Sequence, residues 1–130
     1  MRFILILLVS VFVSNLNGQG ELEKALLDLY ITQHKAIEAG DLETIKSNVT
    51  TESVKQIEEE EDQEFVLEMI QLFTPPLTSI KFGSCTIDGD SAELSATSDH
   101  EGENSDGTIS FVKEEGDWKI AKVSWHSSQE

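Results

Sequence analysis

The stretch from Ile80 to Trp125, IKFGSCTIDGDSAELSATSDHEGENSDGTISFVKEEGDWKIAKVSW, decides the fold of this chain. Apolar residues return at every second position within it, most regularly at Ala92, Leu94 and Ala96. A period of two places alternate side chains on one face, which is typical of a β-strand with one buried side. The stretch therefore predicts strands with one apolar face.

The alternation shifts by one residue at two places. One shift follows Phe82 and the other follows Ile120. An extra residue in one strand of an antiparallel pair forms a β-bulge, which bends the strand and increases its twist. We expect bulges near residues 83–84 and 121–122.

Turn residues divide the same stretch into four segments. Asp88-Gly89 and Glu115-Gly116-Asp117 have the composition of tight turns. The polar segment from Ser98 to Gly107 predicts a longer loop, with a hairpin turn at Asp106-Gly107. Short strands at this spacing predict a sheet of about four antiparallel strands.

Helical periodicity fills the first half of the chain. Apolar residues at spacings of three and four predict a first helix that ends at Gly40, and Asp41 is a suitable N-cap for a second helix over residues 42–47. A third helix is expected from Ser53 to Phe73, or two helices if the acidic run at residues 58–64 breaks it. Helices followed by strands predict an α+β domain, with N-terminal helices packed on the antiparallel sheet.

The first twenty residues have the order of a secretory signal peptide. A basic start at Met1-Arg2 precedes an apolar run from Phe3 to Val13, and a small, polar stretch ends at Gly20. The run of about 11 residues is shorter than the roughly 20 that a membrane-spanning helix needs. We expect residues 1–20 to be removed and residues 21–130 to form one secreted or periplasmic domain with no membrane anchor.

The composition is strongly acidic, with 25 Asp and Glu against 9 Lys and Arg and a formal net charge of −16. Such a chain repels nucleic acid and anionic membranes, so neither is an expected partner. Cys85 is the one cysteine, which excludes an intramolecular disulfide. We expect it to be a small buried hydrophobe in a strand, with an intermolecular disulfide as the alternative.

The sequence does not predict a metal site or a cofactor. Asn104–Ser110 copies the middle of an EF-hand loop, but the outer ligand positions are then Gly102 and Lys113, where carboxylates are needed. Weak calcium binding by this acidic loop as a whole stays open. The histidines are scattered and no glycine loop could cradle a phosphate. The acidic run at residues 58–64 is expected to be a solvated helix face or, alternatively, a docking surface for a basic partner.

Tyr30 and His34 are the candidate pocket residues. They lie four residues apart in the first helix and therefore on the same face. If this face lines a cavity, the pair could exchange protons or orient a ligand; otherwise His34 covers the sheet. Asn48-Val49-Thr50 also matches the N-glycosylation sequon, which has meaning only in a eukaryotic cell.

Two segments resemble one known superfamily. Tyr30 to Leu42 resembles the exit of the first helix, and Glu115 to Val123 the last hairpin, of the nuclear transport factor two-like superfamily, which includes SnoaL-like and cystatin-like roll proteins. The resemblance implies a curved antiparallel sheet wrapped around helices as a cone with a pocket at its open end. It also implies a small exported bacterial protein of unknown function. Enzymes of the superfamily use an Asp or His inside the cone, whereas the inward positions expected here are all apolar: Ala92, Leu94, Ala96, Ile109 and Phe111.

Three functions are compatible with this sequence. The first is a non-enzymatic exported domain that binds a small apolar ligand or a protein partner through the cone and sheet. The second is a structural or oligomerisation module, such as a homodimer, with Phe82, Trp118 and Trp125 as interface anchors. The third is an isomerase- or hydratase-like enzyme that uses Tyr30 and His34.

Overall fold

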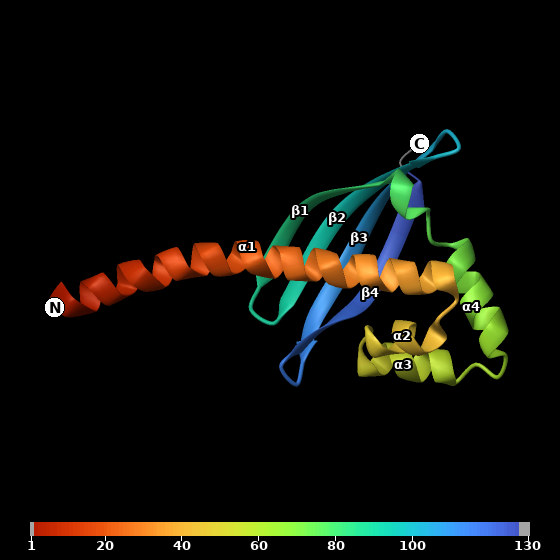
Figure 1. Ribbon diagram of the computed structural model, residues 1–130, viewed down its shortest axis with the longest axis horizontal. Helices are drawn as coiled ribbons and strands as arrows, with labels where there is room; N and C mark the ends of the chain where they lie inside the picture. Colours follow the sequence, from red (N-terminus) through yellow and green to blue (C-terminus); the bar gives the residue numbers. More distant parts are fainter. Residues whose placement is uncertain (1, 128–130) are drawn as a thin grey trace.

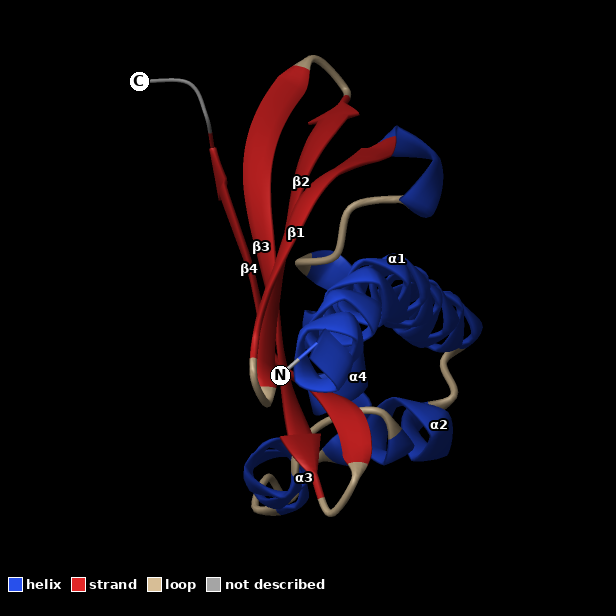
Figure 2. Cartoon of the chain, turned by 90° about the vertical axis from the view of Figure 1, so that its left-hand side faces the viewer, coloured by secondary structure: helices blue, strands red, loops and turns tan. Residues whose placement is uncertain are grey.

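The structure is a computed structural model that describes the backbone of residues 2–127 and the side chains of residues 20–127. Helices come first and strands follow, and the helices cover one face of the sheet (Figures 1 and 2). The elements are α1 (Arg2–Ala39), α2 (Leu42–Ser47), α3 (Thr51–Glu58), α4 (Gln63–Leu72), a 3-10 turn (Leu77–Ser79), β1 (Ile80–Asp88), β2 (Ser91–His100), β3 (Glu103–Glu114) and β4 (Asp117–Ser127). The predicted α+β class is confirmed.

Helix α1 crosses the sheet and continues beyond it toward the N-terminus (Figure 1). The predicted signal peptide falls in this extension, where the side chains of residues 2–19 lie outside the description. Its removal and the export of the chain therefore stay predictions. Among the described residues, no helix combines the length and apolarity needed to span a membrane.

The four strands form one antiparallel sheet in the order β1-β2-β3-β4. Both predicted bulges are present. The register of β1 shifts between Phe82 and Cys85, and Ala121 is the extra residue where Ser110 pairs with Lys122 and Phe111 with Ile120. Bulges bend the strands that carry them, in keeping with the curvature of the sheet in Figure 2.

The predicted loop between Ser98 and Gly107 is wrong. Strand β2 continues to His100 and β3 begins at Glu103, so the turn contains only Glu101 and Gly102, both with positive φ. The polar residues that suggested a loop belong to paired strands, and Gly107 pairs with Trp125 in the middle of the sheet. Glycine at position 107 leaves space for the indole ring of Trp125, because a Cβ there would lie 2.5 Å from two carbons of that ring.

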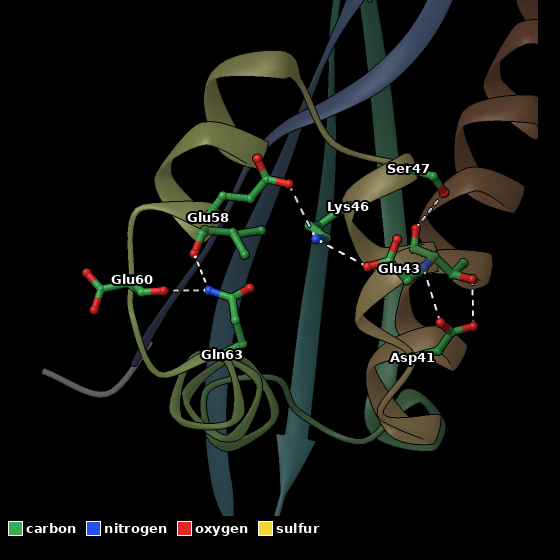
Figure 3. A network of polar contacts seen from close by, with 9 residues as sticks. Asp41, Glu43, Lys46, Ser47, Glu58, Glu60 and Gln63 are labelled. Carbon is green, nitrogen blue, oxygen red and sulfur yellow. Dashed lines mark hydrogen bonds and ion pairs between the residues drawn. The ribbon is translucent and has the colours of Figure 1, made fainter.

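The second helix begins and ends where the sequence predicts. The Asp41 carboxylate accepts a hydrogen bond from the Thr44 amide at 3.2 Å and from its hydroxyl at 2.6 Å, which caps α2 (Figure 3). Gly40 has a φ of 74°, a left-handed conformation that glycine adopts at little cost at a helix C-terminus.

The third predicted helix is two helices, which was the stated alternative. Helix α3 ends at Glu58, and the side chain of Gln63 donates to the carbonyl oxygens of Ile57 and Glu60 at 2.9 and 2.7 Å (Figure 3). Asp62 then caps α4 by accepting from the Phe65 amide at 3.1 Å. The predicted start at Ser53 is wrong by two residues, because Thr50 supplies the N-cap oxygen to the Ser53 amide.

The core lies between α1 and the inner face of the sheet. Leu26 and Tyr30 of α1 pack against the inward row of the strands, which confirms that the five inward positions are buried: Ala92, Leu94, Ala96, Ile109 and Phe111. Burial of each large apolar side chain contributes about 1.5–3 kcal/mol. A smaller cluster of Ala36, Ile37 and Ile45 joins the end of α1 to α2.

The connector between α2 and α3 is attached to β4. The Ile120 amide donates to the Asn48 carbonyl at 2.8 Å, and the Thr50 amide donates to the Ile120 carbonyl at 3.0 Å. The Glu114 carboxylate also accepts from the backbone amide of Thr51 at 3.1 Å and 3.3 Å. These bonds hold the start of α3 beside the β3–β4 hairpin, and this placement forms one wall of a cavity.

Candidate functional site

A cavity of about 490 Å³ opens between α1, the helices α2 to α4 and strand β4. Its walls are mostly apolar, and the branched aliphatic side chains that line it are Ile37, Ile45, Val49, Ile57, Ile70, Ile120 and Val123. Lys122 alone carries a charge among the described residues at its boundary, and it is exposed. A concave site of this size with an apolar lining is suited to a small organic molecule.

Two aromatic residues, Tyr30 and Trp125, meet at this cavity. Tyr30 is 1% exposed, and its ring makes an edge contact with Phe82 at a centroid distance of 5.8 Å. The indole of Trp125 lies over Gly107, so the glycine on β3 fixes where the ring can lie. Both aromatic side chains are thereby positioned by the inner face of the sheet.

The polar atoms of these two residues are buried without a hydrogen bond. Neither the Tyr30 hydroxyl nor Trp125 Nε1 has a partner of acceptable geometry among the described residues. Burial raises the pKa of Tyr30 to about 12, and an interaction with the Trp125 side chain opposes this rise in part. The hydroxyl therefore lies close to the indole and keeps its proton at physiological pH.

His34 contacts Tyr30 but lines a different cavity. The two ring centroids are 6.0 Å apart, yet His34 borders a second cavity of about 390 Å³ near Pro75 and Pro76. Its Nε2 lies 2.6 Å from the Pro75 carbonyl oxygen, which can only accept, so Nε2 carries a proton. Its Nδ1 lies 3.6 Å from a Glu38 carboxylate oxygen. The structure brings Tyr30 and His34 into contact, but not into the same cavity.

Gln33 is a cavity residue that the sequence analysis missed. It is 4% exposed and donates to the Ile45 carbonyl at 3.2 Å, while its oxygen accepts from Asn48 Nδ2 at 3.0 Å. Both of its functional groups are thus satisfied inside the protein. Asn48 is half-buried, and the side-chain nitrogen that the sequon would glycosylate is the one that donates to Gln33.

The candidate interface residues all pack against the core. Phe82, Trp118 and Trp125 are half-buried and contact the apolar cluster on the inner face of the sheet. An interface role for them stays a prediction. Cys85 packs against the same cluster, and burial raises the pKa of its thiol, with a further rise from the charge of Glu23.

The acidic run at residues 58–64 does not gather into a ligand set. Lys46 lies 3.4 Å from a Glu58 oxygen and 3.2 Å from a Glu43 oxygen, which links α2 to α3 (Figure 3). Among the described residues, no group of three His, Cys, Asp or Glu side chains could hold a metal ion.

Helices followed by one curved, four-stranded antiparallel sheet match the NTF-2-like class of fold. The crystal structure of an NTF-2-like protein of unknown function from Silicibacter pomeroyi is similar, with a TM-score of 0.55 and 20% sequence identity. The match covers 84% of this chain and 98% of that one. No known family model and no curated protein sequence matches the chain. The resemblance noted in the sequence is thus confirmed at the level of the fold.

Proposed function

We propose that this chain is an exported, non-enzymatic domain that binds a small apolar ligand in the cavity between α1, the helices α2 to α4 and β4. The observation that carries this proposal is the apolar lining of a 490 Å³ cavity at which Tyr30 and Trp125 each have a buried polar atom without a hydrogen-bond partner among the described residues. The acid–base pair suggested by the sequence does not favour an enzyme, because His34 borders another cavity. Export rests on the signal-peptide pattern of residues 1–20.

Native mass spectrometry of protein purified from the exported fraction of its host tests this proposal. The wild-type protein should carry a bound small molecule, and its mass should correspond to a chain that begins near Glu21. An Ile57→Trp variant, which fills the cavity from α3, should be isolated without the ligand. The exposed neighbour Gln56→Trp is the matched control and should retain it.

The outcomes of this experiment separate the two parts of the proposal. Retention of the same molecule by Ile57→Trp would mean that it binds outside the cavity. A full-length chain in the cell interior would contradict export and leave the binding site untouched.

A protein partner, here a second copy of this chain, is the second candidate, and exposed apolar residues of α4 and its C-terminal end favour it. Leu72 and Phe73 are 72% and 66% exposed, and Phe73 also borders the cavity. Large exposed apolar side chains that lie together often mark interaction sites. Sedimentation of the wild type and a Leu72→Glu variant tests this: a dimer that becomes a monomer on substitution would support an interaction module.

A further inference from the structure

We infer that the cavity selects an uncharged ligand that carries a hydrogen-bond acceptor oxygen, such as a ketone, and that the Tyr30 hydroxyl donates to this oxygen. This inference rests on the proposed ligand-binding function and names the chemistry of the ligand. Its starting observation is that the Tyr30 hydroxyl is buried and has no partner of acceptable geometry among the described residues.

Leaving a buried polar group without a hydrogen bond costs about 1–3 kcal/mol. Such a group in a cavity wall therefore calls for an explanation. Tyr30 and Trp125 both line the cavity, and their unpartnered atoms lie close enough to interact. An indole N–H can only donate, so Trp125 offers no acceptor for the Tyr30 hydroxyl proton. The hydroxyl proton is then free for an acceptor supplied from the cavity.

The lining also decides the charge of the ligand. Lys122 is the one cation among the described residues at the boundary, and its side chain is exposed. On the sheet it pairs with Ser110 of β3. A carboxylate placed at Tyr30 would be desolvated with no buried cation beside it, inside a protein with a net charge of −16. A neutral carbonyl oxygen needs only the donated proton.

Access to the hydroxyl requires a small movement. Both polar atoms are closed to solvent in the free protein, so a ligand oxygen can reach Tyr30 only when side chains around the hydroxyl move, and Trp125 is the neighbour that also lines the cavity. Trp125 therefore becomes a reporter, since its fluorescence should change when an acceptor-bearing molecule binds. A Trp118→Phe background leaves Trp125 as the single tryptophan.

Three probes that share the same seven-carbon tail test the inference in this background: 2-nonanone, 2-methyl-1-nonene and octanoate. The ketone should bind about five- to ten-fold more tightly than the alkene, which has the same shape without the oxygen. Octanoate should bind at least about ten-fold more weakly than the ketone. In Tyr30→Phe, which keeps the ring, the ketone and alkene should bind equally, and alkene affinity should be unchanged.

Each other outcome has a definite meaning. Equal binding of ketone and alkene by the protein with Tyr30 would overturn the acceptor preference and leave the apolar cavity as a binding site. A ketone preference that survives in Tyr30→Phe would overturn the role of the hydroxyl. If none of the three probes changes Trp125 fluorescence or the melting temperature, the proposed function itself fails, and this inference fails with it.

Discussion

Gly107 on β3 and Trp125 on β4 are register partners, and the indole covers the glycine so closely that a Cβ there would lie 2.5 Å from ring atoms Cε3 and Cζ3. The Trp125 side chain, which borders the cavity, therefore packs directly against the backbone of a glycine. This relationship couples the stability of the sheet to the position of Trp125.

Gly107→Ala should lower the free energy of unfolding by about 1–3 kcal/mol, because the added methyl would overlap the Trp125 ring that covers this glycine. Urea unfolding followed by circular dichroism measures this. Trp125→Phe removes part of the clashing ring, so the double variant should be more stable than the sum of the two single effects predicts. Strict additivity would show that the alanine acts elsewhere.

Tyr30→Phe should leave the free energy of unfolding of the ligand-free protein unchanged or raise it. The hydroxyl has no partner of acceptable geometry, so its removal breaks no hydrogen bond and relieves a desolvated polar group. Tyr30→Ala is the contrasting variant and should cost about 3–5 kcal/mol because it leaves a cavity in the core. A loss above about 1 kcal/mol in Tyr30→Phe would mean that the hydroxyl makes a hydrogen bond after all.

Asn48→Ala should lower the free energy of unfolding by about 1–3 kcal/mol, because the buried oxygen of Gln33 loses its donor at 3.0 Å. Asn104→Ala, at an exposed position on β3, is the matched control and should change stability by less than about 0.5 kcal/mol. Thermal unfolding of both variants makes the comparison. Equal effects would show that the Gln33–Asn48 bond contributes nothing.

The cap of α2 should depend on pH. Hydrogen bonds from Thr44 lower the pKa of Asp41 below its ordinary value of 3.8. A lowered folded-state pKa stabilises the protein above the ordinary value, and this contribution is lost as pH falls through the lowered one. Asp41→Asn keeps an acceptor at the cap but cannot titrate. The stability of the variant relative to the wild type should therefore increase as the pH falls below 3.8. A constant difference between pH 2 and 7, measured by thermal unfolding at about half-unit intervals, would contradict this.

Much of the fold could be predicted from local patterns. The alternation at Ala92, Leu94 and Ala96 identified a buried strand face, and the shifts after Phe82 and Ile120 identified both bulges. Asp41 identified the start of α2, because an N-cap acts on an amide three residues away. These features depend on near neighbours, so the order of residues is sufficient to predict them.

The candidate site could be predicted only in part. Tyr30 was identified as a pocket residue, but Trp125 was assigned to an interface and Gln33 was missed. The contacts that define their surroundings join residues distant in sequence, such as Gly107 with Trp125 and Gln33 with Asn48. Composition misled at residues 98–107, where polar residues belong to paired strands because tertiary packing outweighs local preference.

The sequence by itself determined the α+β order, the apolar face of the sheet and the short caps and turns, because periodicity and local hydrogen bonds set them. The tertiary structure alone decided that Tyr30 and His34 border separate cavities, although they share a helix face. It did so because β4 and the Pro75-Pro76 linker approach that face at different places, and which segment covers a helix surface depends on contacts between residues far apart in the chain.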